Sequence, residues 1–311
     1  MSLLLALAKD LHGKMSPSFS IIIPTYNRPE QLVVCLEALT KLNYPADHFE
    51  VIIVDDGSEI SPDRVVASFR HLLDITLIRQ VHAGVAIGRN TGAAKAKGEF
   101  LVFTDDNCQP AQDWLQGLAV YFLKSPNCII GGRTINILPD NIYSTASQLL
   151  ISFLFGYYNT NPAQAGFLNG SNLSVPKDLF LKLGGFEKRF FLVGAEEREF
   201  CDRWMDYGYR MIYTHETLVY HSHRLTFRSF IRQHFKYGCG AFHFHMARTK
   251  RGHLQIKVEP KTFYLNLLRY PFIQKYHLRA PLLSILLVIS QISNAIGFFW
   301  ERFTYNKNVV K

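Results

Sequence analysis

The chain has 311 residues, of which 48% are hydrophobic and 19% are charged, and its formal net charge is +9. A chain of this length and composition buries a sizeable core, which excludes an intrinsically disordered protein and favours one large domain or a domain with an appendage. The five cysteines are odd in number and lack metal-ligand spacing, which favours reduced cytosolic thiols over a disulfide framework.

The positive charge is concentrated in one tract, from Arg224 to Arg279. This tract holds twelve Lys or Arg and one acid, Glu259, so the rest of the chain carries a net charge of about −2. A basic tract this local predicts an anionic partner, such as phospholipid headgroups, a lipid phosphate or nucleic acid. A solvated basic face is the alternative interpretation.

Residues 1–18 are predicted to form an extension before the first strand. Their apolar run, Leu3 to Ala8, is short, follows no basic residue and leads to no evident cleavage site, which disfavours a secretory signal peptide. An amphipathic turn or two, or a disordered tail, is expected instead.

The first half of the chain alternates apolar strands with helical patterns. Strands are predicted at 19–24, 49–56, 74–80 and 99–106, and helices at 28–42, 63–70 and 84–98. The strands are continuously apolar rather than alternating, which indicates burial on both faces. The sequence therefore predicts an α/β fold with a parallel sheet and helices on each side.

Polar side chains follow three of these strands, in the segments PTYNR, DDGS and TDDN. Turn chemistry explains such residues, because Asp and Asn bond nearby backbone in tight bends. The alternative is a site where a cation and a polyphosphate meet, since ligands of such sheets bind at the carboxyl ends of strands. The sequence contains neither the glycine-rich dinucleotide fingerprint nor the ATP phosphate loop, so a nucleotide would be held in another way.

Two apolar segments stand out in the second half. The helical pattern over Ile142 to Tyr158 is explained by core packing, by closure over a site or by membrane contact. Pro281 to Trp300 carries no charge and has about the length that crosses a bilayer. Basic residues flank it on both sides, so a helix lying in one interface, a spanning helix and a core helix all remain open.

Five blocks of the chain together resemble glycosyltransferase family 2, the inverting nucleotide-sugar enzymes with the GT-A fold. The blocks are SIIIPTYNRPEQL, VIIVDDGS, GVAIGRNTGAAKAKGEFLVFTDDN, FLNGSNLSVPKDLFLKLGGFEKRF and GAEEREFCDRWMDYGYRM. The resemblance implies a Rossmann-like, mostly parallel sheet. It predicts a nucleotide-sugar-binding half at 19–135, an acceptor-binding and catalytic half at 136–225, and a basic, helical, membrane-associated region at 226–311.

The resemblance also implies a donor site and a metal. Asp56 would accept a hydrogen bond from the nucleotide base, and Asp105 would bond the ribose hydroxyls. Asp106 would hold Mn²⁺ or Mg²⁺, which prefer hard oxygen ligands, and His221 would be a second ligand, with His223 as the alternative. Asn107 departs from the family, in which many members have an acid at that place. The donor-binding residues are Pro24, Thr25, Tyr26, Arg28, Asp56, Arg89 and Asp105.

An inverting transfer needs a base that takes the proton of the acceptor hydroxyl. The family usually places Glu-Asp at a helix start, whereas this chain has Glu196 and Glu197, and Glu197 holds the base position. A working base, a slower enzyme and a base role for Glu196 all remain open. Acceptor or phosphate contacts are predicted for Asn172, Arg228 and Arg232.

The predicted function is a metal-dependent inverting glycosyltransferase. Its donor would be a nucleoside-diphosphate sugar, with a UDP-sugar favoured, and its acceptor a saccharide or lipid-linked hydroxyl in cell-surface glycan synthesis. We expect it at the cytoplasmic face of the cell membrane, peripheral or single-pass through 281–300, bound to an anionic surface and not to nucleic acid. The alternatives are a catalytically degenerate binding or scaffold protein and a sugar-phosphate nucleotidyltransferase.

Overall fold

The computed structural model describes residues 16–188, 195–253 and 258–309, with side chains up to 306. The described residues form two compact units. The first, here called the sheet unit, comprises residues 16–135, 161–188 and 200–222. The second, the helical unit, comprises residues 136–160, 195–199, 223–253 and 258–309. The predicted extension over 1–18 lies outside the described residues except for 16–18.

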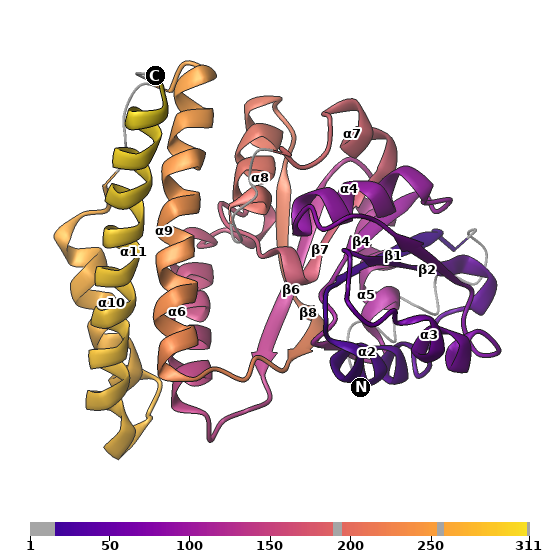
Figure 1. The fold of residues 1–311 in the computed structure, drawn as a ribbon, viewed down its shortest axis with the longest axis horizontal. Helices are drawn as coiled ribbons and strands as arrows, with labels where there is room; N and C mark the ends of the chain where they lie inside the picture. Colours follow the sequence, from indigo (N-terminus) through magenta and orange to yellow (C-terminus); the bar gives the residue numbers. More distant parts are fainter. Residues whose placement is uncertain (1–15, 189–194, 254–257, 310–311) are drawn as a thin grey trace. The chain divides into compact units, whose positions relative to one another are not determined.

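The sheet unit is built on an eight-stranded mixed sheet with the order β3-β2-β1-β4-β7-β6-β8-β5 (Figure 1). The first four strands are β1 (Phe19–Thr25), β2 (Phe49–Asp55), β3 (Ile75–Arg79) and β4 (Phe100–Phe103). They pair in parallel, which confirms the parallel block predicted from their continuous apolar runs.

The other four strands are β5 (Cys108–Pro110), β6 (Ile129–Asn136), β7 (Leu173–Pro176) and β8 (Met211–His221). Their pairings β4/β7, β6/β7 and β5/β8 are antiparallel. Short 3₁₀ segments lie at Ala46–His48, Pro162–Gln164 and Gly170–Asn172. The fold is therefore a mixed α/β sheet in which the antiparallel strands extend the parallel block at β4.

Helices α2 (Pro29–Leu39), α3 (Asp63–Phe69), α4 (Val85–Lys95), α5 (Trp114–Lys124) and α7 (Lys177–Lys182) belong to the sheet unit. Helix α4 lies very close to the sheet at Gly92, where a Cβ atom would come within 2.6 Å of Ile22. This close approach fixes α4 over β1, so the side chains of its first turns are held near the strand ends.

The helical unit contains α6 (Ile142–Tyr158), α9 (Phe227–Lys250), α10 (Lys261–Ile273), the 3₁₀ turn His277–Arg279 and α11 (Ala280–Val309). Helix α11 packs against α9, α10 and α6 (Figure 1). The apolar side of α6 is buried in this packing, with Ala146 and Leu149 beside Leu283 and Leu286. Helix α8 (Glu196–Asp206) has residues 196–199 in the helical unit and its remainder in the sheet unit.

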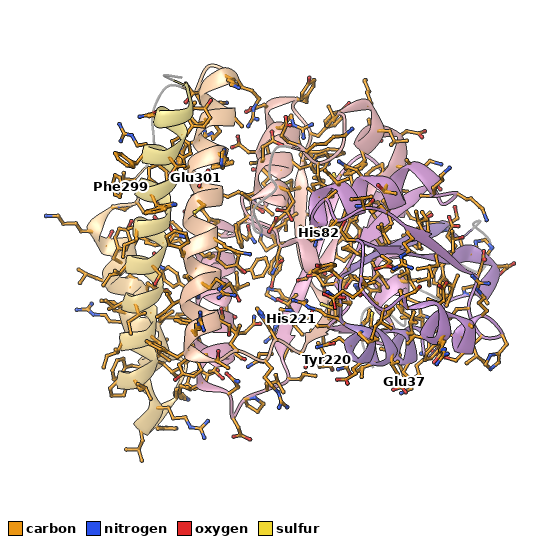
Figure 2. The ribbon with its side chains drawn as sticks, in the orientation of Figure 1. Glu37, His82, Tyr220, His221, Phe299 and Glu301 are labelled. Carbon is orange, nitrogen blue, oxygen red and sulfur yellow. The ribbon has the colours of Figure 1, made fainter. Side chains whose placement is uncertain are left out.

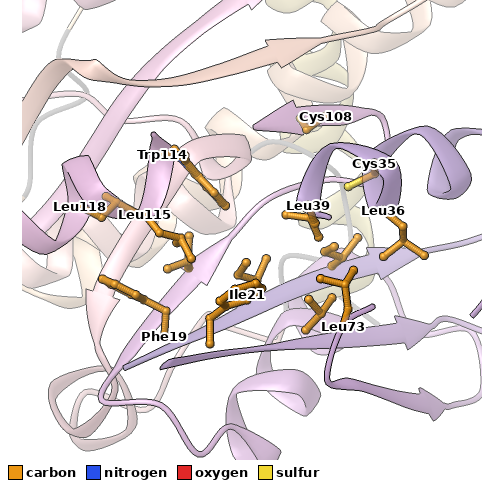
Figure 3. Close-up of a cluster of buried hydrophobic side chains, with 14 of the residues drawn as sticks. Phe19, Ile21, Cys35, Leu36, Leu39, Leu73, Cys108, Trp114, Leu115 and Leu118 are labelled. Atoms are coloured by element: carbon orange, nitrogen blue, oxygen red, sulfur yellow. The ribbon is translucent and has the colours of Figure 1, made fainter. Parts of the chain in front are cut away.

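A large buried cluster in the sheet unit lies between the parallel strands and helices α2 and α5 (Figure 3). Leu32, Leu36 and Leu39 project from one face of α2, because three- and four-residue steps return to the same side of a helix. Phe19 and Ile21 meet them from β1, each at most 1% exposed. Each such side chain contributes about 1.5–3 kcal/mol through burial, so this core holds the strand ends rigidly.

Candidate functional site

The polar segments that follow β1, β2 and β4 meet at one edge of the sheet. Parallel pairing places the end of β1 beside the ends of both β2 and β4. Across this edge the Thr25 hydroxyl donates to Asp106 Oδ2 at 2.9 Å. The structure therefore brings together Thr25, Asp56, Asp105 and Asp106 within the sheet unit, as parallel topology requires.

Asp56 is buried and organises the segment that leads into α4. Its Oδ1 accepts from the Ala83 N–H at 2.9 Å and from Gln80 Nε2 at 2.6 Å. Its Oδ2 accepts from the Gly84 N–H at 2.9 Å and lies 2.9 Å from His82 Nδ1. Gly84 has φ +88°, a conformation that a side chain would strain. Asp56 thus fixes the backbone of residues 80–84.

Tyr26 and His82 form a stacked aromatic pair at the rim of this edge. Their ring centroids are 4.3 Å apart with an interplanar angle of 26°, and Tyr26 is 41% exposed. A flat, exposed pair of rings is a suitable surface for a planar base. Sequence reasoning identified Tyr26 but missed His82, because only the contact with Asp56 brings the His82 segment back to β1.

Arg89 is directed at Asp105. Its Nη2 donates to Asp105 Oδ1 at 2.8 Å, and its side chain is only 4% exposed. Gly170 makes room for the guanidinium, because a Cβ atom there would lie 2.7 Å from Arg89 Nη1. The Cζ atom of the guanidinium lies over the Phe186 ring, 5.8 Å from the ring centroid. Arg89 therefore neutralises Asp105 and sets the orientation of its carboxylate.

Asp106 is more deeply buried than Asp105. It accepts from Thr25 and, at 3.3 Å, from Arg28, whose side chain is half exposed. Burial raises the pKa of Asp106 to about 6, against the opposing effects of Arg28 and Thr25, and nearby Asp105 adds to the rise. A cation bound beside this carboxylate would stabilise its charged form and oppose the effect of burial.

Asp105, Cys108 and His221 form a group whose ligand atoms all lie within 4.8 Å of one another. Antiparallel pairing of β5 with β8 brings them together, because Cys108 is the register partner of His221. Asn107 supports the same junction through Ser222, whose N–H donates to Asn107 O at 2.9 Å. Figure 2 labels His221 beside Tyr220 at the end of β8. Burial lowers the pKa of His221, so the ring is neutral at pH 7, as a metal ligand must be.

This group includes Asp105, whereas the sequence prediction paired His221 with Asp106. The pairing of Asp106 with His221 as metal ligands stays a prediction. Cys108 was missed as a member, since the spacing of the cysteines carries no metal pattern and only the β5/β8 register places this thiol next to His221.

Asn172 is 1% exposed, and its side chain is bonded within the sheet unit. Its Oδ1 accepts from Trp114 Nε1 at 2.9 Å, while its Nδ2 donates to the carbonyls of Arg133 at 3.1 Å and Thr217 at 2.9 Å. These contacts join α5, β6 and β8. Its position supports a structural role, and an acceptor contact through this side chain stays a prediction.

Apart from Pro24, the remaining predicted residues lie in the helical unit. Glu196 and Glu197 occupy the first turn of α8; Glu196 is 2% exposed and accepts from the Ala195 N–H at 3.2 Å, while Glu197 is half-buried. Arg228 and Arg232 lie one turn apart on α9 and are exposed. Pro24 is buried at the end of β1 in the sheet unit.

The fold is a mixed α/β sheet of the GT-A type, with a cluster of carboxylates at the ends of its parallel strands. A sequence model described as glycosyl transferase family 2 matches residues 20–184, more than half of the chain. The chain therefore belongs to glycosyltransferase family 2, and it is a glycosyltransferase. The resemblance seen in the five sequence blocks is confirmed.

Two relatives come from Haloferax volcanii. The glycosyltransferase AglE is 28% identical over 226 residues, which cover 72% of this chain and 73% of AglE. A glucosyl-dolichyl phosphate glucuronosyltransferase is 27% identical over 220 residues, which cover 65% of this chain and 68% of the relative.

Solved structures share the fold. The mannosyltransferase PcManGT from Pyrobaculum calidifontis, in complex with GDP-Man and Mn²⁺, has a TM-score of 0.64 at 18% identity, covering 94% of this chain and 99% of PcManGT. TarS of S. aureus, in complex with UDP-GlcNAc, has a TM-score of 0.51 at 18% identity, covering 94% of this chain and 92% of that chain. At this identity the likeness shows the fold alone.

Proposed function

We propose that this protein transfers a sugar, with inversion and with the help of a divalent metal ion, from a nucleoside-diphosphate sugar to a hydroxyl acceptor. One observation carries the proposal: the sheet edge gathers an aromatic stack, three carboxylates and a histidine in one unit. Family membership favours glycosyl transfer over the two alternatives, a degenerate binding protein and a nucleotidyltransferase.

The donor base would lie against the Tyr26–His82 pair. Asp56 supports this surface by fixing residues 80–84 through four donors. These four groups lie against both oxygens of the Asp56 carboxylate, so we propose that its first role is to shape the base pocket. Accepting a hydrogen bond from the base would be a second role. Asp105, held by Arg89, would accept from the ribose hydroxyls. A UDP-sugar remains the favoured donor; PcManGT and TarS, which share the fold, are known with GDP-Man and UDP-GlcNAc.

The residues present fit a divalent ion. Asp105 offers a carboxylate oxygen and His221 a neutral imidazole, both of which suit Mn²⁺, and Asp106 adds a second carboxylate at the same edge. Carboxylates and phosphate oxygens alone would suit Mg²⁺. When bound there, the ion would neutralise the charge that develops on the departing nucleoside diphosphate. Arg28, half exposed beside Asp106, supplies positive charge at the same place.

The acceptor hydroxyl would lose its proton to Glu197 as it attacks the anomeric carbon. Glu197 stands in the first turn of α8, where the helix dipole stabilises a carboxylate. Glu196 is more deeply buried and bonded to backbone, which favours Glu197 as the base. Arg228 and Arg232 would contact an anionic acceptor.

The acceptor is proposed to be a lipid-linked or saccharide hydroxyl used in cell-surface glycan synthesis at the cytoplasmic face of the membrane. The relative named as a glucosyl-dolichyl phosphate glucuronosyltransferase supports this class. Helix α11 supports membrane association, because the helical stretch over residues 277–306 is long enough to cross a bilayer and contains an 18-residue window of mean hydropathy 1.9.

The test is metal-dependent nucleotide binding, measured by thermal stability. UDP, GDP, TDP and CDP are titrated with and without Mn²⁺ into the wild type, Asp106→Ala and the matched surface control Asp47→Ala. We expect one nucleotide at 100 times its Kd to raise the Tm by roughly 5 °C in the presence of metal. Asp47→Ala should retain this rise and Asp106→Ala should lose it. A rise that is independent of metal, or equal in all three proteins, contradicts the proposal.

A further inference from the structure

Helices α10 and α11 expose an unusual amount of apolar surface. More than half of the large exposed hydrophobic side chains of the described residues come from 258–303. Leu278, in the 3₁₀ turn before α11, is 98% exposed, and on α11 Ile285 is 56% and Phe299 61% exposed. The members of this apolar face are Leu265, Phe272, Ile273, Leu278, Leu282, Ile285, Val288, Ile292, Ile296, Phe299, Trp300 and Phe303.

The exposed side chains of α11 recur at three- and four-residue intervals and so occupy one side of the helix along its described length. The opposite side is also apolar but is buried, with Leu283, Leu286 and Leu287 at most 3% exposed. Figure 2 shows Phe299 on the outer side of α11 and Glu301 on the side that faces α9.

Helix α9 covers the buried side in a fixed parallel register. A Cβ atom on Gly238 would lie 1.9 Å from the Asn294 carbonyl oxygen, and one on Gly297 would lie 2.0 Å from that of Phe235. Further along, His243 Nε2 is 2.9 Å from Glu301 Oε1. The backbones of the two helices are therefore in close contact. Any orientation of α11 relative to a membrane also determines the orientation of α9.

Helix α9 carries charges at the level of the uncharged stretch of α11. Lys236 lies two residues before Gly238, level with the middle of residues 281–300, and Arg232 lies one turn earlier and is exposed. If α11 crossed a bilayer, α9 would carry both cations to its centre, which is strongly unfavourable for lysine and arginine. The packing thus disfavours a spanning arrangement that hydropathy alone allows.

The charge around the apolar face is positive. Between residues 258 and 306 the sequence has two acids, and both are bonded: Glu259 by Tyr157 and Tyr158, and Glu301 by His243. The basic residues of the same stretch are all exposed; they are Lys261, Arg269, Lys275, Arg279 and Arg302. An apolar strip bordered by cations complements an anionic phospholipid surface.

We propose that α11 lies in the plane of the membrane, with the apolar face inserted into one leaflet of an anionic bilayer and α9 on its aqueous side. The occupant of the apolar face is the lipid itself. This inference concerns membrane topology and makes no use of the sugar-transfer chemistry, so its failure would leave the proposed activity standing.

The first test is flotation with vesicles of phosphatidylcholine and phosphatidylglycerol. Ile285→Asp and Ile292→Asp replace exposed members of the apolar face, and Ile60→Asp is the matched control, because Ile60 is 78% exposed in the sheet unit. We expect each face variant to weaken binding at least about tenfold and the control to leave it unchanged. Binding should fall with added salt and with phosphatidylcholine alone. Equal binding by all variants overturns the proposal.

The second test measures depth. Nitroxide labels are placed on single cysteine substitutions of Leu282, Ile292 and Phe299, and their accessibility to oxygen and to an aqueous nickel complex is compared in vesicles. An in-plane helix puts the three labels at one depth inside a leaflet. A crossing helix separates the first from the last by about 25 Å along the bilayer normal, which overturns the proposal. If the labels are inaccessible to both reagents and the protein sediments as a dimer, the proposal is overturned. The apolar face would then be covered by a second copy of the chain.

Discussion

The two units depart from the usual distribution of polar and apolar side chains in opposite ways. The sheet unit buries charged groups at its strand ends, where Asp56, Arg89 and Asp106 are each at most 4% exposed. The helical unit instead exposes a continuous apolar face on α10 and α11. Burying charge and exposing large apolar surface are both unfavourable unless a partner compensates for them. The comparison supports the two proposals made above, a nucleotide-sugar site in the first unit and a lipid-facing surface in the second.

The largest expected effect separates chemistry from donor binding. Glu197→Gln keeps the size of the side chain but removes the base, so we expect the transfer rate to fall about 10²–10⁴-fold. The metal-dependent Tm rise with nucleotide should stay, because donor binding is assigned to the sheet unit. Glu196→Gln is the comparison variant, measured in the same transfer assay. A larger loss in Glu196→Gln than in Glu197→Gln would move the base to Glu196.

A second prediction concerns acid stability in the helical unit. Burial lowers the pKa of His234 to about 4, whereas its unfolded value is about 6.5. The unfolded chain binds the proton first, so stability is highest above pH 6.5 and falls as the pH drops towards 4, by at most about 3 kcal/mol from this group. Denaturant unfolding at pH 7.5 and 4.5 measures the loss. His234→Gln should reduce the difference between the two pH values; an unchanged difference rules out His234 as its source.

A third prediction sharpens the account of the α9–α11 contact. Gly238→Ala places a Cβ atom against the backbone of α11. This overpacking should lower the free energy of unfolding by about 3 kcal/mol. The control is Gly156→Ala on α6, where nothing lies within 4 Å of the added atom. There the gain in helix propensity should raise stability by about 0.5–1 kcal/mol. Effects of the same sign in both variants would show that the two helices do not depend on this close approach.

The smallest expected effect tests the aromatic rim of the sheet unit. Tyr26→Ala removes one ring of the stacked pair and should weaken nucleotide binding by about 0.5–1.5 kcal/mol, or roughly two- to tenfold. Tyr26→Phe keeps the ring and should bind within about twofold of the wild type. Calorimetric titration with the nucleotide found in the thermal screen measures both. Equal losses in the two variants would assign the effect to the hydroxyl group rather than to stacking.

The sequence by itself determined the parallel block and the family. Continuous apolar runs such as residues 51–54 indicate burial on both faces, and the resemblance of five motifs to glycosyltransferase family 2 is confirmed by the family match. Parallel topology then implies that Thr25, Asp56 and Asp106 share one edge. Each of these inferences depends on local periodicity or on residues that are neighbours along the chain, which is the information that a single sequence carries best.

Tertiary structure alone decided the contacts between distant segments. The β5/β8 register places Cys108 beside His221, the bonds of Asn172 lie inside the sheet unit, and Arg89 is directed at Asp105. Over residues 282–288 both sides of α11 are apolar in sequence, so composition there does not distinguish the buried side from the exposed side. These features depend on which partner each side chain meets, and that partner comes from elsewhere in the chain.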